Sequence, residues 1–390
     1  MRLHWLSDVL DHPAPFVTMS LDASRETPSG EQQVDLRVAS LERELRNAGA
    51  SADVVDAAAE AARRPTGRGG AVGKLVVACA DGVVLDLTLP VPPVREEAVV
   101  GPAPHLLPAV RAMAASTPYL LVQVDRAGAD LTFVGPTGGS EHESVEGGHD
   151  VLHKIPGGAW SQRRYQSRVE DSWERNADAV AAEVDTVVSR HAPPVVVVTG
   201  DERAVGRLRD AVSPHTAERL HVLDGGGRAA GVDEASLAAD VEAALVAHRR
   251  SVRTDVVGRF EQAEGRQDVA AQGLADVVEA LRRAQVDELL LRDDPTSTLT
   301  LWVGPEPLQL GSTADEVTAL GVDQPQEVRA DIALARAVVG SDAGVTLWDV
   351  DTDGEVDLTG GVAALLRWSD PSTPHDSARS MPGHGEHSGH

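Results

Sequence analysis

The chain has 390 residues, a formal net charge of -26 and a hydrophobic content of 42%. This length exceeds one ordinary hydrophobic core and predicts two or three domains. The negative charge repels phosphate, so it excludes nonspecific nucleic-acid binding over most of the surface, and we expect no DNA partner.

The sequence also indicates a cellular compartment. No run approaches the 18 apolar residues of a membrane span, and the first residues lack the apolar core of a signal peptide. The single cysteine, Cys79, excludes a disulfide within the chain. Its surroundings follow a strand pattern, so we expect it in a core. Together these features predict a cytoplasmic protein without a membrane partner.

The N-terminal part predicts a domain of mixed α and β structure. Apolar residues recur at helical spacing from Val34 to Leu45, and a second, alanine-rich helix is expected near Val54 to Arg63. Strands are expected at Pro15 to Asp22, Leu75 to Cys79 and Val83 to Leu89. The PVPPV run, Pro90 to Val94, has the composition of a rigid linker, so we expect the first domain to span residues 1–94.

The central part predicts alternating strands and helices, which we assign to a domain over residues 95–250. Four consecutive valines within Pro193 to Gly200 indicate a buried strand of the parallel type. The Gly-rich acidic stretch from Gly135 to Asp150 is expected to be a loop or a poorly ordered segment. Further strands are expected at Tyr119 to Asp125, Leu131 to Val134 and Leu220 to Leu223. Helices are expected at Leu106 to Ala115, 161–190, Glu202 to Val212 and Asp233 to Glu264.

The C-terminal part predicts a compact α/β sandwich over residues 251–368. Strands are expected at Glu288 to Arg292, Thr298 to Val303 and Val345 to Trp348. Helices are expected at Leu274 to Ala284, Ala314 to Leu320, Gln326 to Val339 and Val362 to Leu366. The tail, residues 369–390, consists largely of Pro, Ser, Gly and His, and this composition predicts disorder.

One stretch, HKIPGGAWSQRRYQSR (His153 to Arg168), is basic although the protein is acidic. It contains no Asp or Glu and carries four cations, Lys154, Arg163, Arg164 and Arg168. Gly157 and Gly158 permit a sharp reversal of the chain. Ser161 suits the N-cap of the helix that follows, where the helix dipole adds partial positive charge. The stretch therefore predicts a local anion site suited to RNA phosphate.

The same stretch holds side chains that suit unpaired bases. Trp160 and Tyr165 can stack on them, and Gln162 and Gln166 lie one turn apart on the same helix face. A solvated surface loop followed by ordinary helix-face arginines is the alternative interpretation, and composition alone leaves it open.

Three other motifs lack an element that their chemistry needs. Asp349 to Gly360 resembles a calcium loop but has Gly360 where a bidentate Glu belongs, so a β-hairpin is the simpler interpretation. Asp224 to Gly231 (DGGGRAAG) has neither the lysine nor the spacing of a phosphate loop. The tail carries scattered histidines, His375, His384, His387 and His390. We therefore expect no metal and no cofactor.

Taken together, the order of elements and the basic stretch resemble a known family. The chain resembles the bacterial relatives of the archaeal and eukaryotic class-I peptide release factor and of Pelota. GGAWSQRRYQ (Gly157 to Gln166) stands where release factors place a glycine-glycine-glutamine loop. Two other parts of the chain also resemble the family. One is the middle-domain run PPVVVVTGDERAVGRLRDAV. The other is the last unit, with GLADVVEALRRAQVDELLLRD, ADIALARAVV and GGVAALLRW. The resemblance covers roughly Leu106 to Trp368.

This resemblance implies a fold and a site. The expected fold is α/β with three domains: an α+β first domain, a central mixed-sheet domain with a GG-loop and a long helix, and a C-terminal α/β sandwich like the kink-turn-binding ribosomal proteins. In release factors the glutamine directly follows the two glycines and the loop positions a water against the peptidyl-tRNA ester. Here Ala159, Trp160 and Ser161 intervene before Gln162. The first-domain codon-reading motif of the family is not visible in residues 1–94.

Three hypotheses follow from the resemblance and its departures. The first is a ribosome-associated translation factor that occupies the A site in hibernation or stress, as in the branch to which Balon belongs. It would place the basic residues on rRNA near the tRNA acceptor end, with elongation factor EF-Tu as a candidate delivery partner. The second is a peptidyl-tRNA hydrolase that uses Gln162 with Gly157 and Gly158. The third is a non-ribosomal binding protein that retains the fold.

Overall fold

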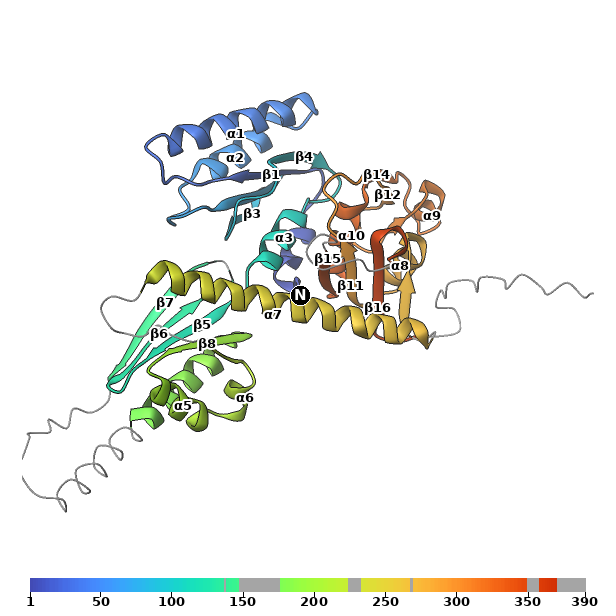
Figure 1. The fold of residues 1–390 in the computed structure, drawn as a ribbon. Helices are drawn as coiled ribbons and strands as arrows, with labels where there is room; N and C mark the ends of the chain where they lie inside the picture. Colours follow the sequence, from blue (N-terminus) through green and yellow to red (C-terminus); the bar gives the residue numbers. More distant parts are fainter. Residues whose placement is uncertain (137, 147–175, 224–232, 267–268, 349–357, 370–390) are drawn as a thin grey trace, which may run out of the picture. The chain divides into compact units, whose positions relative to one another are not determined.

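The computed structural model describes the chain except residues 137, 147–175, 224–232, 267–268, 349–357 and 370–390 (Figure 1). The fold is a mixed α/β architecture with several sheets. The chain divides into two compact units. One comprises residues 1–88, 92–114 and 253–390, and the other comprises residues 89–91 and 115–252.

The first unit begins with a sheet of strand order β3-β2-β1-β4. Its strands are β1 (Phe16–Asp22), β2 (Gly73–Cys79), β3 (Gly82–Leu89) and β4 (Glu97–Gly101). Strand β1 pairs antiparallel with both β2 and β4. The sheet therefore continues beyond the proline-rich run that separates β3 from β4.

Two helices pack on this sheet, α1 (Gly30–Asn47) and α2 (Ala52–Arg63). The predicted helical spacing is confirmed, because Val34, Val38, Leu41 and Leu45 of α1 are all buried. They form one core with the alanines of α2 and with Val17, Met19 and Leu21 of β1. Cys79 is buried at the end of β2, as expected.

The rest of the first unit is the C-terminal module. Its main sheet has the order β10-β16-β11-β15, and a smaller sheet has the order β13-β12-β14. The strands are β10 (Ala270–Gln272), β11 (Val286–Arg292), β12 (Thr300–Val303), β13 (Leu310–Gly311), β14 (Gln326–Arg329), β15 (Gly344–Trp348) and β16 (Val362–Leu366). The helices are α8 (Leu274–Arg282), α9 (Ala314–Thr318), α10 (Ala330–Gly340) and the short 3-10 helix η2 (Thr359–Gly361).

Two helices outside these sheets also belong to the first unit. They are η1, a 3-10 helix (His4–Asp11), and α3 (Leu107–Ala115). The residues before η1 contact the C-terminal module: Arg2 pairs with Asp287 at 2.7 Å and bridges to Gly344 of β15. The first residues of the chain are thereby fixed to a module almost 300 residues away in sequence.

The second unit is built on a five-stranded mixed sheet of order β7-β6-β5-β8-β9. Its strands are β5 (Tyr119–Val124), β6 (Gly128–Val134), β7 (Ser140–Glu146), β8 (Val195–Gly200) and β9 (Leu220–Val222). Strand β8 runs parallel to both β5 and β9, whereas β6 is antiparallel to both β5 and β7.

Helices cover both faces of this sheet, as the four-valine strand predicts. A helix over 176–191 and α5 (Glu202–Ala211) pack on one face, against Val196 and Val198. Val241 and Leu245 of α7 (Glu234–Gly265) pack on the other face, against Val195 and Val197. A short helix, α6 (Pro214–Ala217), joins α5 to β9.

Three predicted elements are wrong. Gly135 to Asp150 was expected to be a loop, but β7 forms there and pairs with β6. Its polar side chains are those of a solvent-exposed edge strand. Val362 to Leu366 was expected to be a helix and is β16, which pairs with β10 and β11. The predicted helix from Gln326 begins only at Ala330, because Gln326 to Arg329 pair with β12 as β14.

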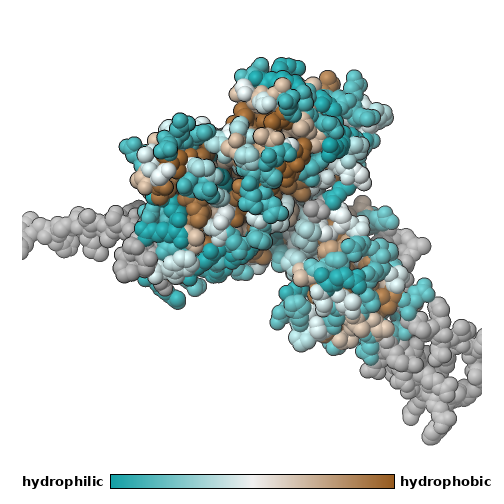
Figure 2. All heavy atoms as spheres, turned by 180° about the vertical axis from the view of Figure 1, so that it is seen from behind, coloured by the Kyte–Doolittle hydropathy of each residue, from teal (hydrophilic) through white to brown (hydrophobic). Residues whose placement is uncertain are grey.

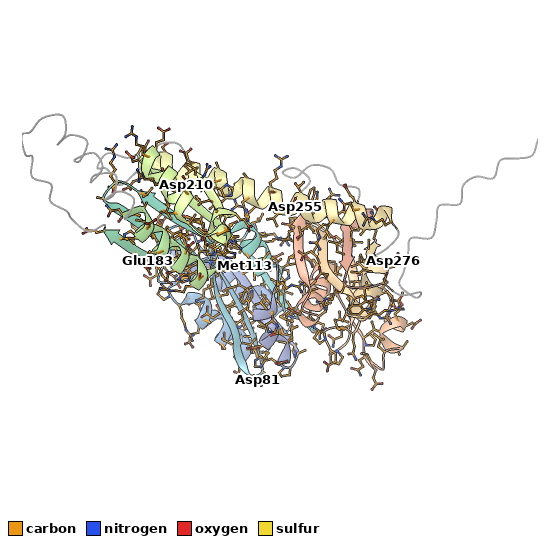
Figure 3. All side chains as sticks on the ribbon, turned by 90° about the horizontal axis from the view of Figure 1, so that it is seen from below. Asp81, Met113, Glu183, Asp210, Asp255 and Asp276 are labelled. Carbon is orange, nitrogen blue, oxygen red and sulfur yellow. The ribbon has the colours of Figure 1, made fainter. Side chains whose placement is uncertain are left out.

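The surface reflects the composition. Hydrophilic residues cover most of the face shown in Figure 2, and the acidic residues Glu183, Asp210, Asp255 and Asp276 come from four different helices (Figure 3). The negative charge is therefore spread over both units rather than confined to one segment. Within the described residues, no helix is both long and apolar enough to cross a membrane.

Candidate nucleic-acid interface

The site residues predicted from the sequence lie outside the described residues. They are Lys154, Gly157, Gly158, Trp160, Gln162, Arg163, Arg164, Tyr165, Gln166 and Arg168. The same holds for Asp224 to Gly231, most of the calcium-like stretch and the histidine tail. What the structure describes is the scaffold on either side of the basic stretch.

That scaffold is firmly held on both sides. Before the basic stretch, β7 pairs with β6 along its whole length, from Ser140 to Glu146. After it, the helix over 176–191 returns to the same strands, where Arg190 pairs with Glu143 at 2.9 Å. His191 stacks on Phe133 of β6 with ring centroids 4.1 Å apart. The basic stretch therefore connects two elements that pack on one sheet.

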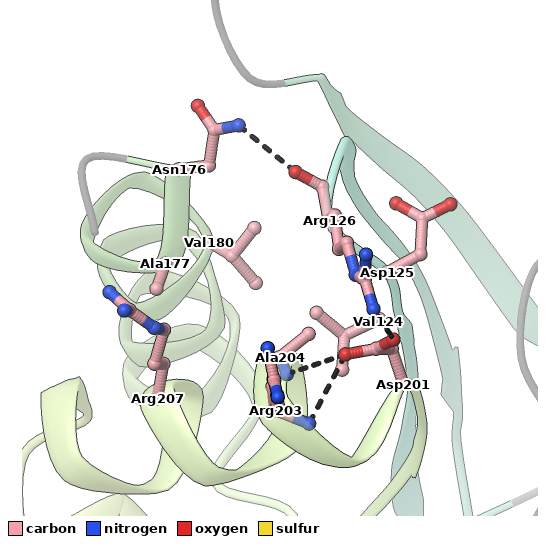
Figure 4. Close-up of a pocket in the computed structure, with 10 residues that line it drawn as sticks. All are labelled: Val124, Asp125, Arg126, Asn176, Ala177, Val180, Asp201, Arg203, Ala204 and Arg207. Atoms are coloured by element: carbon pink, nitrogen blue, oxygen red, sulfur yellow. Dashed lines mark hydrogen bonds and ion pairs between the residues drawn. The ribbon is translucent and has the colours of Figure 1, made fainter. Parts of the chain in front are cut away.

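A shallow hollow lies where the chain re-enters the described helix (Figure 4). It forms at the carboxyl ends of the parallel strands β5 and β8, the end of such a sheet where ligands bind in α/β proteins. The helix over 176–191 provides one wall, and Asn176 Nδ2 donates to the backbone oxygen of Arg126 at 3.1 Å. The hollow is lined by Val124, Asp125, Arg126, Asn176, Ala177, Val180, Asp201, Arg203, Ala204 and Arg207.

The turn into α5 requires a glycine. Gly200 ends β8 with a φ of +142°, and a Cβ there would lie 1.8 Å from the Val124 backbone oxygen. The next residue, Asp201, donates its backbone N–H to that same oxygen at 3.1 Å. The close approach of β8 to β5 thus sets the position of Asp201 at the edge of the hollow.

Asp201 organises this edge. Its carboxylate caps α5 by accepting from the backbone N–H groups of Arg203 and Ala204 at 3.1 and 3.2 Å. It also accepts from the Arg126 guanidinium at 3.0 Å. Burial raises the pKa of Asp201, but the backbone hydrogen bond from Ala204 and the hydrogen bond and charge of Arg126 outweigh it and lower the pKa. Asp201 is thus anionic at neutral pH and neutralises Arg126.

Two further arginines line the hollow. Arg203 and Arg207 are one turn apart on α5, so their side chains share a helix face. In the part of the chain that the structure describes, neither guanidinium has an ion-pair or hydrogen-bond partner. Two guanidinium groups beside a hollow, without a partner among the described residues, form a small cationic surface that can bind phosphate.

Sequence reasoning did not identify these residues as a site. The sequence predicts a strand that ends at Gly200 and a helix from Glu202, and both predictions are confirmed by β8 and α5. Arg126, however, lies 75 residues before Asp201. Only the parallel pairing of β5 with β8 brings the two together.

Comparisons with known proteins match this unit to a family. Residues 118–266 match the model of bacterial archaeo-eukaryotic release factor family 2. The match runs from the residue before β5 to just beyond α7, so it includes the sheet, the hollow and the basic stretch. Over these residues the chain is similar to the bacterial archaeo-eukaryotic release factors.

Relatives and solved structures are similar over most of the chain. Two uncharacterized proteins of Mycobacterium tuberculosis, MT2704 and Rv2629, are each 27% identical over 371 residues, which is 94% of this chain and 96% of each relative. The fold is similar to Archaeoglobus fulgidus Pelota (17% identity, TM-score 0.35, 76% of this chain and 79% of that one). It is also similar to Saccharomyces cerevisiae Dom34, described as a translation termination-like factor (12% identity, TM-score 0.40, 78% and 82%).

Proposed function

We propose that this release-factor-like chain is a ribosome-associated translation factor that occupies the A site, in hibernation or stress. The observation that carries the proposal is the family match over residues 118–266, because the matched segment contains the basic stretch from His153 to Arg168. A cytoplasmic location follows from the proposal. We also keep a division of the chain into three domains as part of it.

The charges indicate how the protein would meet RNA. With a net charge of -26, most of its surface repels phosphate, so binding must be local. Arg163, Arg164 and Arg168 would contact rRNA near the tRNA acceptor end. Arg203 and Arg207, whose guanidinium groups have no partner among the described residues, would add two phosphate contacts beside the point where the basic stretch rejoins the sheet.

Co-sedimentation with bacterial ribosomes tests this proposal. Purified protein is mixed with ribosomes, with and without peptidyl-tRNA and with and without EF-Tu, across a salt series. We expect saturable binding that weakens with salt, because counterions compete for the phosphates. No binding at low salt in any of these states would contradict the proposal and favour a non-ribosomal binding protein that retains the fold.

Charge-reversal variants locate the interface. Changing Arg163, Arg164 and Arg168 to Glu should abolish co-sedimentation. The double variant Arg203→Glu/Arg207→Glu should weaken it and flatten the dependence of log K on log salt by about 1 to 2. A matched control, Arg43→Glu/Arg250→Glu, changes the same charge at two exposed helix positions and should bind like the wild type. Equal loss in the control would indicate a general charge effect.

Hydrolysis of peptidyl-tRNA is the second candidate function. It is favoured by the Gly157-Gly158 pair followed by Gln162 in a family of release factors. Backbone donors of such a loop would stabilise the oxyanion of the attacked ester. The test is peptide release from stalled ribosomes, which Gln162→Ala should abolish and Gln32→Ala, at an exposed position of α1, should preserve. No release in any ribosomal state would eliminate this function and leave A-site occupancy unaffected.

A further inference from the structure

Three side chains of different chemistry converge at the tip of the β2–β3 hairpin, a place that the proposed function does not use. The donor atoms of His12, Cys79 and Asp81 all lie within 4.8 Å of one another. Cys79 ends β2, and Asp81, which is labelled in Figure 3, stands in the turn before β3. His12 directly follows η1 and comes from a distant part of the sequence.

The three groups already contact one another. His12 Nδ1 lies 3.0 Å from the Asp81 carboxylate, and the Asp81 backbone N–H points at the Cys79 sulfur at 3.4 Å. Cys79 is buried, whereas the side chain of His12 is 35% exposed and that of Asp81 is 52% exposed. The group therefore has a closed inner side, formed by the sulfur, and an outer side open to solvent.

These donor types match one class of ligand. Zinc binds thiolate sulfur, imidazole nitrogen and carboxylate oxygen at about 2.0 to 2.3 Å, in tetrahedral geometry. Donors around one such ion lie about 3.5 Å apart, so small side-chain rotations from the present spacing would suffice. We propose that His12, Cys79 and Asp81 bind a divalent cation of the zinc class, with water as the fourth ligand.

Metal binding would release one proton and would link two segments of the chain. The Cys79 thiol loses its proton to solvent as the sulfur–metal bond forms, and His12 binds through neutral Nδ1. The ion links the end of η1 to the β2–β3 hairpin. Because Arg2 already pairs with Asp287 of the C-terminal module, the metal stabilises the N-terminal segment at its other end. Binding to the folded state alone raises its stability.

Cobalt(II) offers a specific readout because Cys79 is the only cysteine. A thiolate-to-cobalt charge-transfer band can arise at this site alone, even though histidines of the C-terminal tail also offer nitrogen ligands. We expect the full-length protein to show this band at one equivalent of cobalt, and zinc should displace it. Zinc should also raise the thermal midpoint of the wild type. Cobalt binding without a charge-transfer band would overturn the proposal.

Variants separate the three ligands from general effects on folding. Cys79→Ser should abolish the band, and His12→Ala and Asp81→Asn should abolish or strongly weaken it. His4→Ala, an exposed histidine of η1, is the matched control and should keep it. If the buried Cys79 variant misfolds, the two partly exposed positions still decide the question. A band of unchanged strength in both His12→Ala and Asp81→Asn would rule out the site.

Discussion

The imidazole Nε2 of His105 lies 2.8 Å from the carboxylate of Glu97, and both side chains are buried. Arg95 and Arg329 also pair with this carboxylate, at 2.5 and 3.3 Å. Arg329 belongs to β14 and Glu97 to β4, so the pair joins the N-terminal sheet to the C-terminal module within the first unit. The Glu97 carboxylate thus connects two sheets that are far apart in the sequence.

This cluster makes stability depend on acidic pH. Burial raises the pKa of Glu97, but the hydrogen bonds from His105 and Arg95 and the charges of His105 and Arg329 outweigh it and hold the pKa far below its ordinary 4.5. The folded state therefore binds fewer protons, and the stabilisation is present above about pH 4.5 and lost as pH falls below it. Glu97→Gln should cost about 3 kcal/mol at pH 7. Urea unfolding measures the free energy of unfolding of the wild type and the variant at both pH values. The difference between them should be smaller at pH 3 than at pH 7.

A neighbouring residue provides the control for this prediction. Glu96 pairs with Arg37 at 2.8 Å, but both side chains are about one-third exposed. Glu96→Gln should change stability by less than about 1 kcal/mol at either pH. Equal costs at positions 96 and 97 would contradict the role given to burial.

Two glycines near the hollow should respond oppositely to alanine. Gly200→Ala places a Cβ 1.8 Å from the Val124 oxygen in a conformation with positive φ, so the ends of β5 and β8 must separate. We expect a cost of at least about 3 kcal/mol. Gly206 lies inside α5 with no atom within 4 Å of a new Cβ, so Gly206→Ala should stabilise by about 0.5 to 1 kcal/mol. Thermal unfolding should show a lower midpoint than wild type for Gly200→Ala and a higher midpoint for Gly206→Ala.

The cap of α5 can be separated from its ion pair. Asp201→Ala removes the acceptor of two backbone N–H groups and should cost about 1 kcal/mol. Asp201→Asn keeps a capping oxygen and loses only the charge opposite Arg126, so it should cost less. Chemical denaturation measures both. Equal losses for Asn and Ala would mean that the ion pair, and not the cap, dominates.

Arg336 should be a structural residue of the C-terminal module. Its side chain is 4% exposed, and it donates to the backbone oxygens of Gly304, at 2.9 Å, and of Pro305. Burial lowers its pKa to about 10 against the opposing effect of Glu306, so it remains charged at neutral pH. Arg336→Met preserves length but leaves the Gly304 oxygen without its donor, and we expect a loss of about 2 kcal/mol. Denaturant unfolding of Arg336→Met and of the exposed control Arg43→Met measures this loss. Equal midpoints for the two variants would contradict a structural role for Arg336.

Sequence patterns predicted most elements because their periodicity spans many residues. The four buried positions of α1 were sufficient to predict that helix, and the valine run was sufficient to predict strand β8. The errors occur where a pattern is short or polar. VAALL of β16 has five apolar residues, too few to distinguish a strand from a helix, and SEHESVE of β7 has no apolar face. The Arg126–Asp201 pair depends on strand register, which no local pattern contains.

Strand β7 lies at the edge of its sheet in the described part of the chain, with one row of backbone groups facing outward. Such an edge can template pairing with another polypeptide. Here Glu141, Glu143 and Glu146 lie on this strand, and although Arg190 pairs with Glu143, a second copy approaching edge to edge would bring like charges together. The acidity of this strand therefore disfavours ordered aggregation through this edge.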